Sequence, residues 1–166
     1  MNKPADPLGV VVDCMVFVQA AANQKSPAAR IFDLLDEGKI TLYVSKVILA
    51  EARHVLNRPE VRASLRNLTD VAVEALFERL DQHATLIRQV PKRFTYPRDP
   101  KDEPYINLAV EMKADYLVSR DNDLLDLMKW ENEEGREFQR RFRFLQIVTP
   151  ENFLAAMEKG HELPGD

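Results

Sequence analysis

Short apolar runs recur along the chain and alternate with longer segments whose apolar residues are spaced as on one face of a helix. The run from Val10 to Val12 is continuous and β-branched, which is typical of a strand buried on both faces of a parallel sheet. Runs of the same kind predict further strands at residues 41–44, 85–87, 115–119 and 144–148.

Helix signals fill the intervals between these strands. Ser26-Pro27 places a capping residue before a proline at the first helical position, and Gly38 marks the end of that helix. Further helices are predicted at residues 45–56, 69–83, 102–113, 122–130 and from 150 onward, whereas 91–100 is a loop and 131–143 is either helical or a loop. This alternation predicts an α/β fold, with a mainly parallel central sheet flanked by helices. We expect a single domain at residues 9–158, with tails at 1–8 and 159–166.

Acidic residues fall where two of the predicted strands end and on two of the predicted helices. Asp13 ends the first apolar run, Asp121 closely follows the run 115–119, Glu51 lies on an apolar helix face, and Asp102 opens another helix. Burying an unpaired carboxylate costs several kcal/mol, and ligands of such sheets bind beyond the carboxyl ends of the strands. Carboxylates that converge there predict a hard cation, Mg²⁺ or Mn²⁺, with oxygen ligands.

Each of these residues also has a purely structural interpretation. Asp13, Asp102 and Asp121 are each suited to cap a helix, and Asp123 is either a further metal ligand or a first-turn acid that favours the helix dipole. Glu51 has the alternative of a buried ion pair with Arg53 or with a more distant arginine.

Two neighbouring acids compete with Asp102 for its predicted role. Asp99 is expected to lie outside the helix, and Glu103 is expected to point sideways. Asp102 is favoured because its spacing from Ile106 and Ala109 places it on the inward face of the helix.

Composition narrows the class of protein. The chain has 166 residues and a net charge of −4, so nucleic acid would have to be bound by local basic patches rather than by bulk charge. Cys14 is the only cysteine, which excludes an intrachain disulfide and fits a reducing compartment. The chain lacks both a signal-peptide core and a run of the ~18 apolar residues that a membrane span needs. These features predict a cytoplasmic protein without membrane contact.

The order of the acidic motifs resembles a known family. The sequence shows Asp13 after a strand, the spacing Ser-x-x-x-x-x-Glu from Ser45 to Glu51, Asp102 at a helix start, and Val118-Ser-Arg-Asp-Asn-Asp-Leu-Leu125. This set resembles the PIN-domain family, in particular the toxin components of bacterial toxin–antitoxin pairs, and the closing segment 147–154 is similar to that branch. The resemblance implies a three-layer α/β/α fold. It places the acidic site at Asp13, Glu51, Asp102 and Asp121, with Asp123 as a fifth residue.

The resemblance also implies an activity and partners. The expected reaction is hydrolysis of single-stranded RNA by a metal-activated water, with Asp13, Asp102 and Asp121 as direct ligands. Glu51 is either a ligand or the group that orients the water. An antitoxin protein and a homodimer are the implied protein partners. DNA stays open as a substrate, because an acidic site does not itself distinguish it from RNA.

Arginines interleaved with aromatic residues indicate where RNA would bind. One such cluster lies at residues 136–144 and another in the loop 91–100, and both suit pairing with phosphates and stacking with bases. The candidate RNA-binding residues are Arg120, Ser45, Arg136 and Arg140. The alternative for each cluster is a solvated charged surface whose phenylalanines turn into the core.

Met15 departs from the family pattern. The family commonly has Asp-Thr-Asn or Asp-Thr-Ser at the end of the first strand, whereas this chain has Asp13-Cys14-Met15. An apolar third residue loses a hydrogen bond in or near the site. The alternative function is therefore a catalytically weakened domain that acts as a protein- or RNA-binding module.

Overall fold

The centre of the molecule is a five-stranded parallel sheet. The computed structural model describes residues 6–160, and the strand order is β3-β2-β1-β4-β5. The strands are β1 (Leu8–Val12), β2 (Ile40–Ser45), β3 (Thr85–Ile87), β4 (Tyr116–Val118) and β5 (Gln146–Val148). Every pairing is parallel, so the predicted α/β fold with a parallel sheet is confirmed. Val10, Val11 and Val12 of the central strand are fully buried, as their continuous apolar run predicts.

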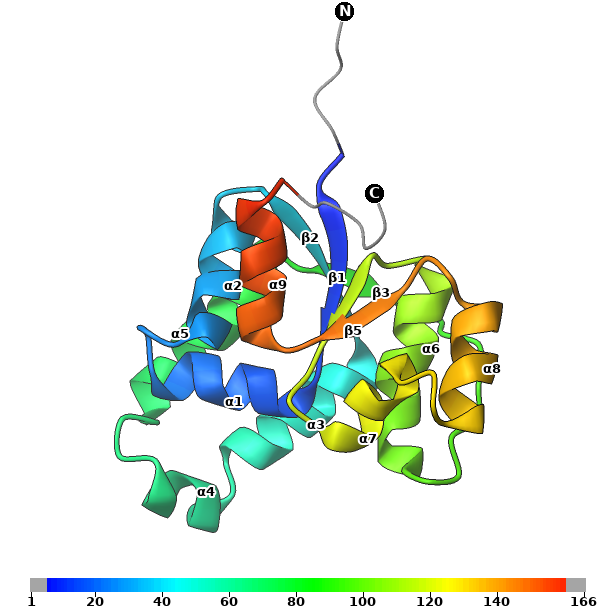
Figure 1. Cartoon of the computed structure of the whole chain (residues 1–166). Helices are drawn as coiled ribbons and strands as arrows, with labels where there is room; N and C mark the ends of the chain where they lie inside the picture. Colours follow the sequence, from blue (N-terminus) through cyan, green and yellow to red (C-terminus); the bar gives the residue numbers. More distant parts are fainter. Residues whose placement is uncertain (1–5, 161–166) are drawn as a thin grey trace, which may run out of the picture.

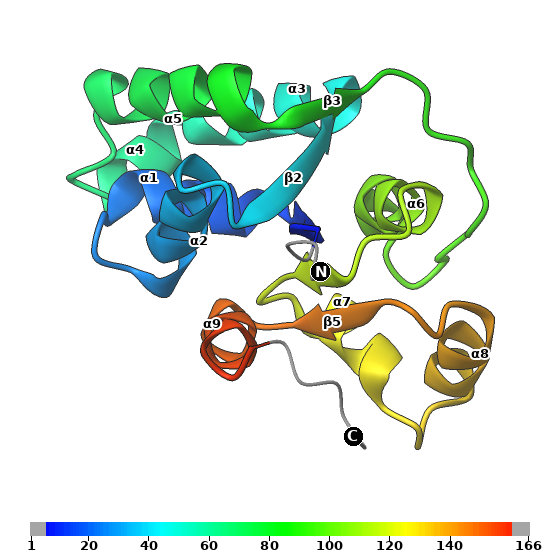
Figure 2. The same ribbon diagram turned by 90° about the horizontal axis from the view of Figure 1, so that it is seen from above.

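Helices cover both faces of this sheet and its carboxyl edge. Helices α2 (Pro27–Asp36), α5 (Asp70–His83) and α9 (Pro150–Glu158) lie on one face, and α6 (Glu103–Glu111) and α8 (Glu133–Arg141) lie on the other (Figure 2). At the carboxyl ends of the strands lie α1 (Cys14–Ala22), α3 (Lys46–Leu56), α4 (Pro59–Ser64) and α7 (Asn122–Leu125) (Figure 1). Two 3₁₀ helices, η1 (Pro100–Asp102) and η2 (Asp126–Met128), complete the set.

Side-chain caps define where several of the helices begin. The Ser26, Ser45, Thr69 and Thr149 hydroxyls each accept a hydrogen bond from a backbone N–H of the first helical turn, which satisfies a donor that the helix leaves open. After α2 the chain turns at Gly38, where φ is +74°, a conformation that glycine adopts without strain. These boundaries agree with the sequence-based prediction.

The structure also differs from the prediction in several elements. No bounds were predicted for helix α1, because its sequence is apolar almost throughout and lacks helical periodicity; its residues 16–18 and 20–21 are buried. Asp13 is the N-cap of this helix, as the structural interpretation of that residue predicted. The short helix α4 was missed. The predicted helix at 122–130 splits into α7 and η2, and the predicted strand at 144–148 forms only at 146–148. Segment 131–143 contains α8, so its helical alternative holds.

The two ends of the chain were predicted to be tails, and no segment was predicted to span a membrane. The predicted tails, 1–8 and 159–166, fall mostly outside the described residues. Within residues 6–160, no helix has both the length and the apolar character that crossing a bilayer requires.

Candidate metal centre

The carboxyl edge of the sheet brings the predicted acidic residues into one neighbourhood. Asp13 directly follows β1, and Asp121 lies three residues after the end of β4. These two strands pair in register, with Val12 beside Val118. The inward face of α6 packs on the same part of the sheet, which brings the start of this helix to the edge.

Asp99 and Asp102 reach the site from the turn that leads into α6. The Asp99 side chain accepts a hydrogen bond from the backbone N–H of Lys101, which holds it at the start of η1. Asp102 precedes α6 but has helical φ and ψ and makes no side-chain capping bond. Asp102 thus occupies the N-cap position, as its structural interpretation predicted, but its side chain makes no capping bond and faces the site.

Asp121 and Asp123 come from the turn between β4 and α7. The Asp121 Oδ1 accepts a hydrogen bond of 2.9 Å from the backbone N–H of Asp123, so Asp121 is the N-cap of α7, as one interpretation predicted. Asp123 is bound on its other side by Arg98, whose Nε lies 2.7 Å from Oδ1. Arg98 also contacts Asp126 at 2.6 Å, and it thereby ties the loop before η1 to α7.

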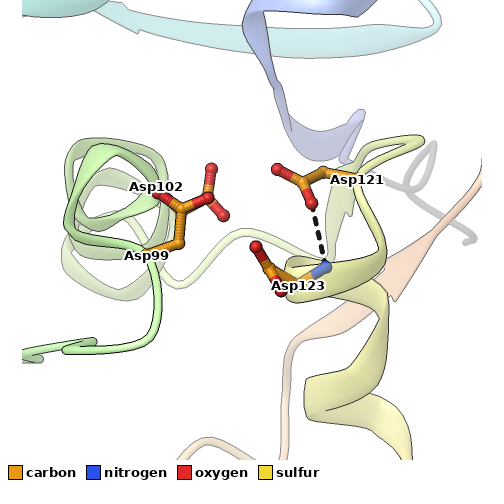
Figure 3. Close-up of side chains that lie close together, drawn as sticks. All are labelled: Asp99, Asp102, Asp121 and Asp123. Atoms are coloured by element: carbon orange, nitrogen blue, oxygen red, sulfur yellow. Dashed lines mark hydrogen bonds between the residues drawn. The ribbon is translucent and has the colours of Figure 1, made fainter.

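These two pairs of aspartates face each other across a short gap. Figure 3 shows Asp99 and Asp102 on one side and Asp121 and Asp123 on the other. One carboxylate oxygen of each residue lies within 4.8 Å of one oxygen of every other residue. We call these four residues the aspartate cluster. The sequence placed Asp102, Asp121 and Asp123 in the site and ranked Asp99 only as a rival.

Asp13 lies beside the aspartate cluster and is buried. Its Oδ2 accepts a hydrogen bond from the Ser119 hydroxyl, and its Oδ1 accepts one from the Val16 backbone N–H at 3.2 Å. The same Ser119 oxygen accepts from the backbone N–H of Asp121 at 2.9 Å. Ser119, fully buried, therefore connects the two acidic strand ends.

Glu51 lies next to Cys14, the residue after Asp13, at the start of α1. The Tyr105 hydroxyl donates a hydrogen bond of 2.7 Å to the Glu51 Oε1, and the Cys14 side chain is a further hydrogen-bonding partner of Glu51. The alternative ion pair with Arg53 does not form, because Arg53 instead contacts Glu74 at 3.2 Å. Glu51 thus has a tyrosine rather than a cation as its partner.

Crowded negative charge and burial alter the acid–base properties of the site. Burial raises the pKa of Asp102 to about 8, and the nearby charges of Asp121, Asp99 and Asp13 act in the same direction. The pKa of Asp13 is raised to about 6, mainly by burial and secondarily by Asp121, against the lowering effect of its hydrogen bonds. Burial also raises the pKa of the Cys14 thiol to about 12, so this cysteine is not a nucleophile at neutral pH.

Two features of the aspartate cluster suit a divalent cation: its ligand groups, and one buried oxygen atom that lacks a hydrogen-bond partner. All of its ligand groups are carboxylates, which are the ligands that Mg²⁺ and Mn²⁺ prefer. Among the described residues, the Asp102 Oδ2 is buried yet has no hydrogen-bond partner, an arrangement that is costly unless a cation or a donor fills it. A bound ion would supply that partner and would offset the repulsion among the four charges.

The residues predicted to bind RNA have partners within the protein. Arg120 forms an ion pair with Glu151, and Arg136 donates to the carbonyl of Trp130 at 2.9 Å. The guanidinium of Arg140 lies over the Trp130 ring at 5.2 Å from its centroid. Ser45 is buried as the N-cap of α3.

The phenylalanines of these basic segments mostly turn inward. Phe138 and Phe142 are buried, and both pack against Phe94. Phe144 is 40% exposed. The interpretation in which the phenylalanines belong to the core therefore describes this region better than a continuous stacking surface for bases.

Sequence reasoning missed residues that hold the acids in place. Ser119, Tyr105 and Arg98 contact Asp13, Glu51 and Asp123 respectively. Ser119 is two residues before Asp121, and this closeness was a usable signal. Tyr105 and Arg98 are distant in sequence from the acids that they contact, so only the fold brings them together.

Comparisons with known proteins agree with this picture. A family model described as PIN domain matches residues 9–123. An uncharacterized protein of Methanocaldococcus jannaschii is 30% identical over 151 residues, which cover 90% of this chain and 92% of the relative. The family match includes Asp13, Glu51 and the whole aspartate cluster, whereas α8 and α9 lie beyond it.

Proposed function

The chain belongs to the PIN-domain family, and from this membership we propose that it is a metal-dependent endoribonuclease that cleaves single-stranded RNA. PIN domains are generally metal-dependent nucleases, and the aspartate cluster is compatible with that activity. The observation that carries the proposal is the buried Asp102 Oδ2 without a hydrogen-bond partner, in a cluster of carboxylates from two separate segments. This is the atom that a bound Mg²⁺ or Mn²⁺ explains.

In this proposal the residues of the site have distinct roles. Asp99, Asp102, Asp121 and Asp123 would hold the metal, together with Asp13. A metal held there would supply a water of lowered pKa and would stabilise negative charge on the phosphate oxygens. Ser119 and the Val16 N–H fix the orientation of Asp13 for this role. Glu51, oriented by Tyr105, accepts a hydrogen bond from the attacking water.

The biological setting belongs to the proposal as well. The resemblance to the toxin branch supports a cytoplasmic toxin restrained by an antitoxin, and it supports a homodimer. Arg120, Ser45, Arg136 and Arg140 are proposed to contact RNA, which for the arginines requires exchange of their present partners.

A cleavage assay tests the activity. Purified wild type and the Asp121→Asn variant are incubated with single-stranded RNA, and separately with DNA, in Mg²⁺, in Mn²⁺ or in EDTA. Asparagine also caps helices well, so this change removes the charge but keeps the cap of α7. The matched control is Asp81→Asn, which alters an exposed acid on α5, outside the site.

We expect metal-dependent cleavage of RNA that Asp121→Asn abolishes and Asp81→Asn retains. Cleavage in EDTA, or equal cleavage by wild type and Asp121→Asn, would contradict the proposal. RNA binding without cleavage would favour the second candidate, a binding module. The observation behind that candidate is Met15, which is 50% exposed beside Asp13 and offers no polar group to the site.

A further inference from the structure

The carboxyl edge of the sheet changes from acidic to basic along its length. Asp13 and Asp121 follow β1 and β4, whereas Lys46 follows β2 and Arg88 follows β3. The strand register places Leu8 beside Ile40 and Val10 beside Leu42, so continuing it brings Asp13 level with Ser45. Ser45 in turn pairs with Ile87. The basic residues therefore continue the line of the metal site along the same edge.

A cavity of about 320 Å³ opens at this basic end. Its lining comes from the start of α3, the segment after β3 and the start of α6, and it includes Pro100 and Glu103, which flank Asp102 in sequence. The volume lies within the range of ~300–1,000 Å³ that is common for small-ligand sites. The cavity is thus one nucleotide in scale and adjoins the residues that carry the aspartate cluster.

The charged residues of the cavity favour an anion. Three basic residues line it, namely Lys46, Arg88 and Lys92. Lys46 begins α3, Arg88 directly follows β3, and Lys92 lies in the loop between β3 and η1. Lys92 pairs with Glu103 at 3.1 Å, and Glu103 also accepts from the Tyr96 backbone N–H at 2.8 Å. Within residues 6–160, neither Lys46 nor Arg88 forms an ion pair, so these two cations carry the surplus positive charge of the cavity.

Apolar residues complete the lining. Val47, Val90, Pro100 and Pro104 contribute to the wall, and Val47 is 61% exposed. The side chain of Asn107 is already committed to the backbone of Phe94 and neighbouring residues. The cavity therefore combines exposed cations with an apolar wall, which suits a nucleotide whose phosphate contacts the cations and whose base or sugar contacts the wall.

We propose that this cavity, at the junction of α3, β3 and α6, binds one nucleotide of the substrate strand next to the scissile phosphate, with its phosphate on Lys46 and Arg88. This inference rests on the proposed nuclease function and adds a direction to it. In this arrangement the RNA strand runs along the carboxyl edge of the sheet from the aspartate cluster toward β3. Lys92 would contribute a further contact by leaving Glu103.

The test compares wild type with the double variant Lys46→Ala/Arg88→Ala. Both positions are exposed, so the fold is expected to tolerate the change, and a thermal melt verifies this. The matched control, Arg30→Ala/Lys39→Ala, removes the same charge from α2 and from the residue preceding β2, outside the lining of the cavity. Two readouts are made: steady-state cleavage of RNA in Mg²⁺, and fluorescence anisotropy with the same RNA in EDTA over a range of salt concentrations.

We expect the double variant to lose about tenfold in kcat/KM, mainly through KM, and a similar factor in affinity. The slope of log affinity against log salt should fall by about 0.7, the value for one phosphate that is no longer neutralised on a single strand. The control should match wild type. The reversed pair Lys46→Arg/Arg88→Lys should restore binding, since it keeps both charges.

The outcomes separate this inference from the nuclease proposal. If wild type cleaves RNA and the double variant has the same KM, affinity and salt slope as wild type, the nucleotide site is overturned and the nuclease proposal stands. Binding that depends on Lys46 and Arg88 without any cleavage would support the site and count against the nuclease. If wild type neither binds nor cleaves single-stranded RNA or DNA, both fall.

Discussion

At the start of α6, the metal-free fold disfavours the ionised form of the Asp102 side chain. The side chain is buried, and its Oδ2 has no hydrogen-bond partner among the described residues. Burial and, to a smaller extent, the charges of three other aspartates raise its pKa to about 8. A raised pKa of a carboxyl group means that the folded state prefers the protonated form. The ionised Asp102 therefore lowers the stability of the metal-free protein, and the same group is available to bind a cation.

The pH dependence of stability should reveal this cost. Between pH 4 and pH 8 the unfolded chain ionises Asp102 while the folded protein retains its proton, so the free energy of unfolding falls as the pH rises through this window. Asp102→Asn removes the titration. In EDTA we expect the variant to be more stable than wild type at pH 8.5 by a few kcal/mol, since one pKa unit corresponds to about 1.4 kcal/mol, and to differ little at pH 4.

Urea denaturation at both pH values measures the difference. Asp81→Asn serves as control, because a surface substitution outside such a site is expected to stay within about 0.5 kcal/mol of wild type. Equal stabilities of wild type and Asp102→Asn at pH 8.5 would show that Asp102 has a partner or water contact in solution that compensates its burial.

Metal binding should release protons for the same reason. Carboxylates bind a metal in their ionised form, and the metal-free pKa values of Asp102 and Asp13 are about 8 and about 6. We therefore expect the affinity for Mn²⁺ to fall as the pH drops from 8.5 to 5.5. Titration calorimetry at pH 7 in buffers of different ionisation enthalpy counts the protons released. A count near zero would mean that neither residue is a ligand or that neither pKa is raised.

At the scale of elements, α8 supports the loop that delivers Asp99. Phe138 of α8 and the following Phe142 pack edge-on against Phe94, with ring centroids 5.2 and 6.0 Å apart. The Arg141 guanidinium donates to the Arg93 carbonyl at 2.6 Å. Helix α8 lies beyond the segment that the family model matches, so this chain uses an element outside that segment to hold one wall of the site.

Truncating Phe138 should therefore destabilise the fold and loosen the loop. Phe138 is 1% exposed, and Phe138→Ala is expected to cost about 3–5 kcal/mol through lost burial and the cavity left behind. Phe144→Ala, at a 40% exposed position of the same segment, is the matched control and should cost far less. Urea denaturation gives the free energies, and hydrogen exchange of residues 91–99 reports the loop. Equal effects of the two variants would contradict the supporting role of α8.

Sequence patterns predicted elements well where a periodic face or a cap was present. Helices α2, α3 and α5 combine apolar spacing with Ser or Thr caps, and all were predicted within a few residues. The bounds of helix α1 were not predicted because both its inner and outer positions are apolar. In the site, strand ends located Asp13 and Asp121, whereas Asp99 joins through the 3₁₀ turn η1, a geometry that no spacing rule indicated. Contacts such as Tyr105 with Glu51 depend on tertiary packing and have no local signal.

At the scale of the whole molecule, the charge distribution sets how a polyanion approaches. The net charge is −4, and the aspartate cluster places negative charge at the point where the proposed function requires the scissile phosphate to bind. Without metal this charge would repel an RNA strand, whereas one or two divalent ions would reduce or neutralise it. We therefore expect Asp99→Asn/Asp121→Asn to bind single-stranded RNA several-fold more tightly than wild type in EDTA at low salt, although it has lost cleavage.

The predicted gain in RNA affinity depends on the salt concentration and on which acids are removed. The difference should shrink as the Debye length falls from ~10 Å at 0.1 M salt toward ~3 Å at 1 M, since it comes from charge rather than from a new contact. The control Glu60→Gln/Glu78→Gln removes two exposed acids from α4 and α5 and should change affinity much less. Fluorescence anisotropy decides between the outcomes. If both double variants gain equally, net charge alone governs binding; if the aspartate variant binds more weakly than wild type, the carboxylates themselves contact the RNA.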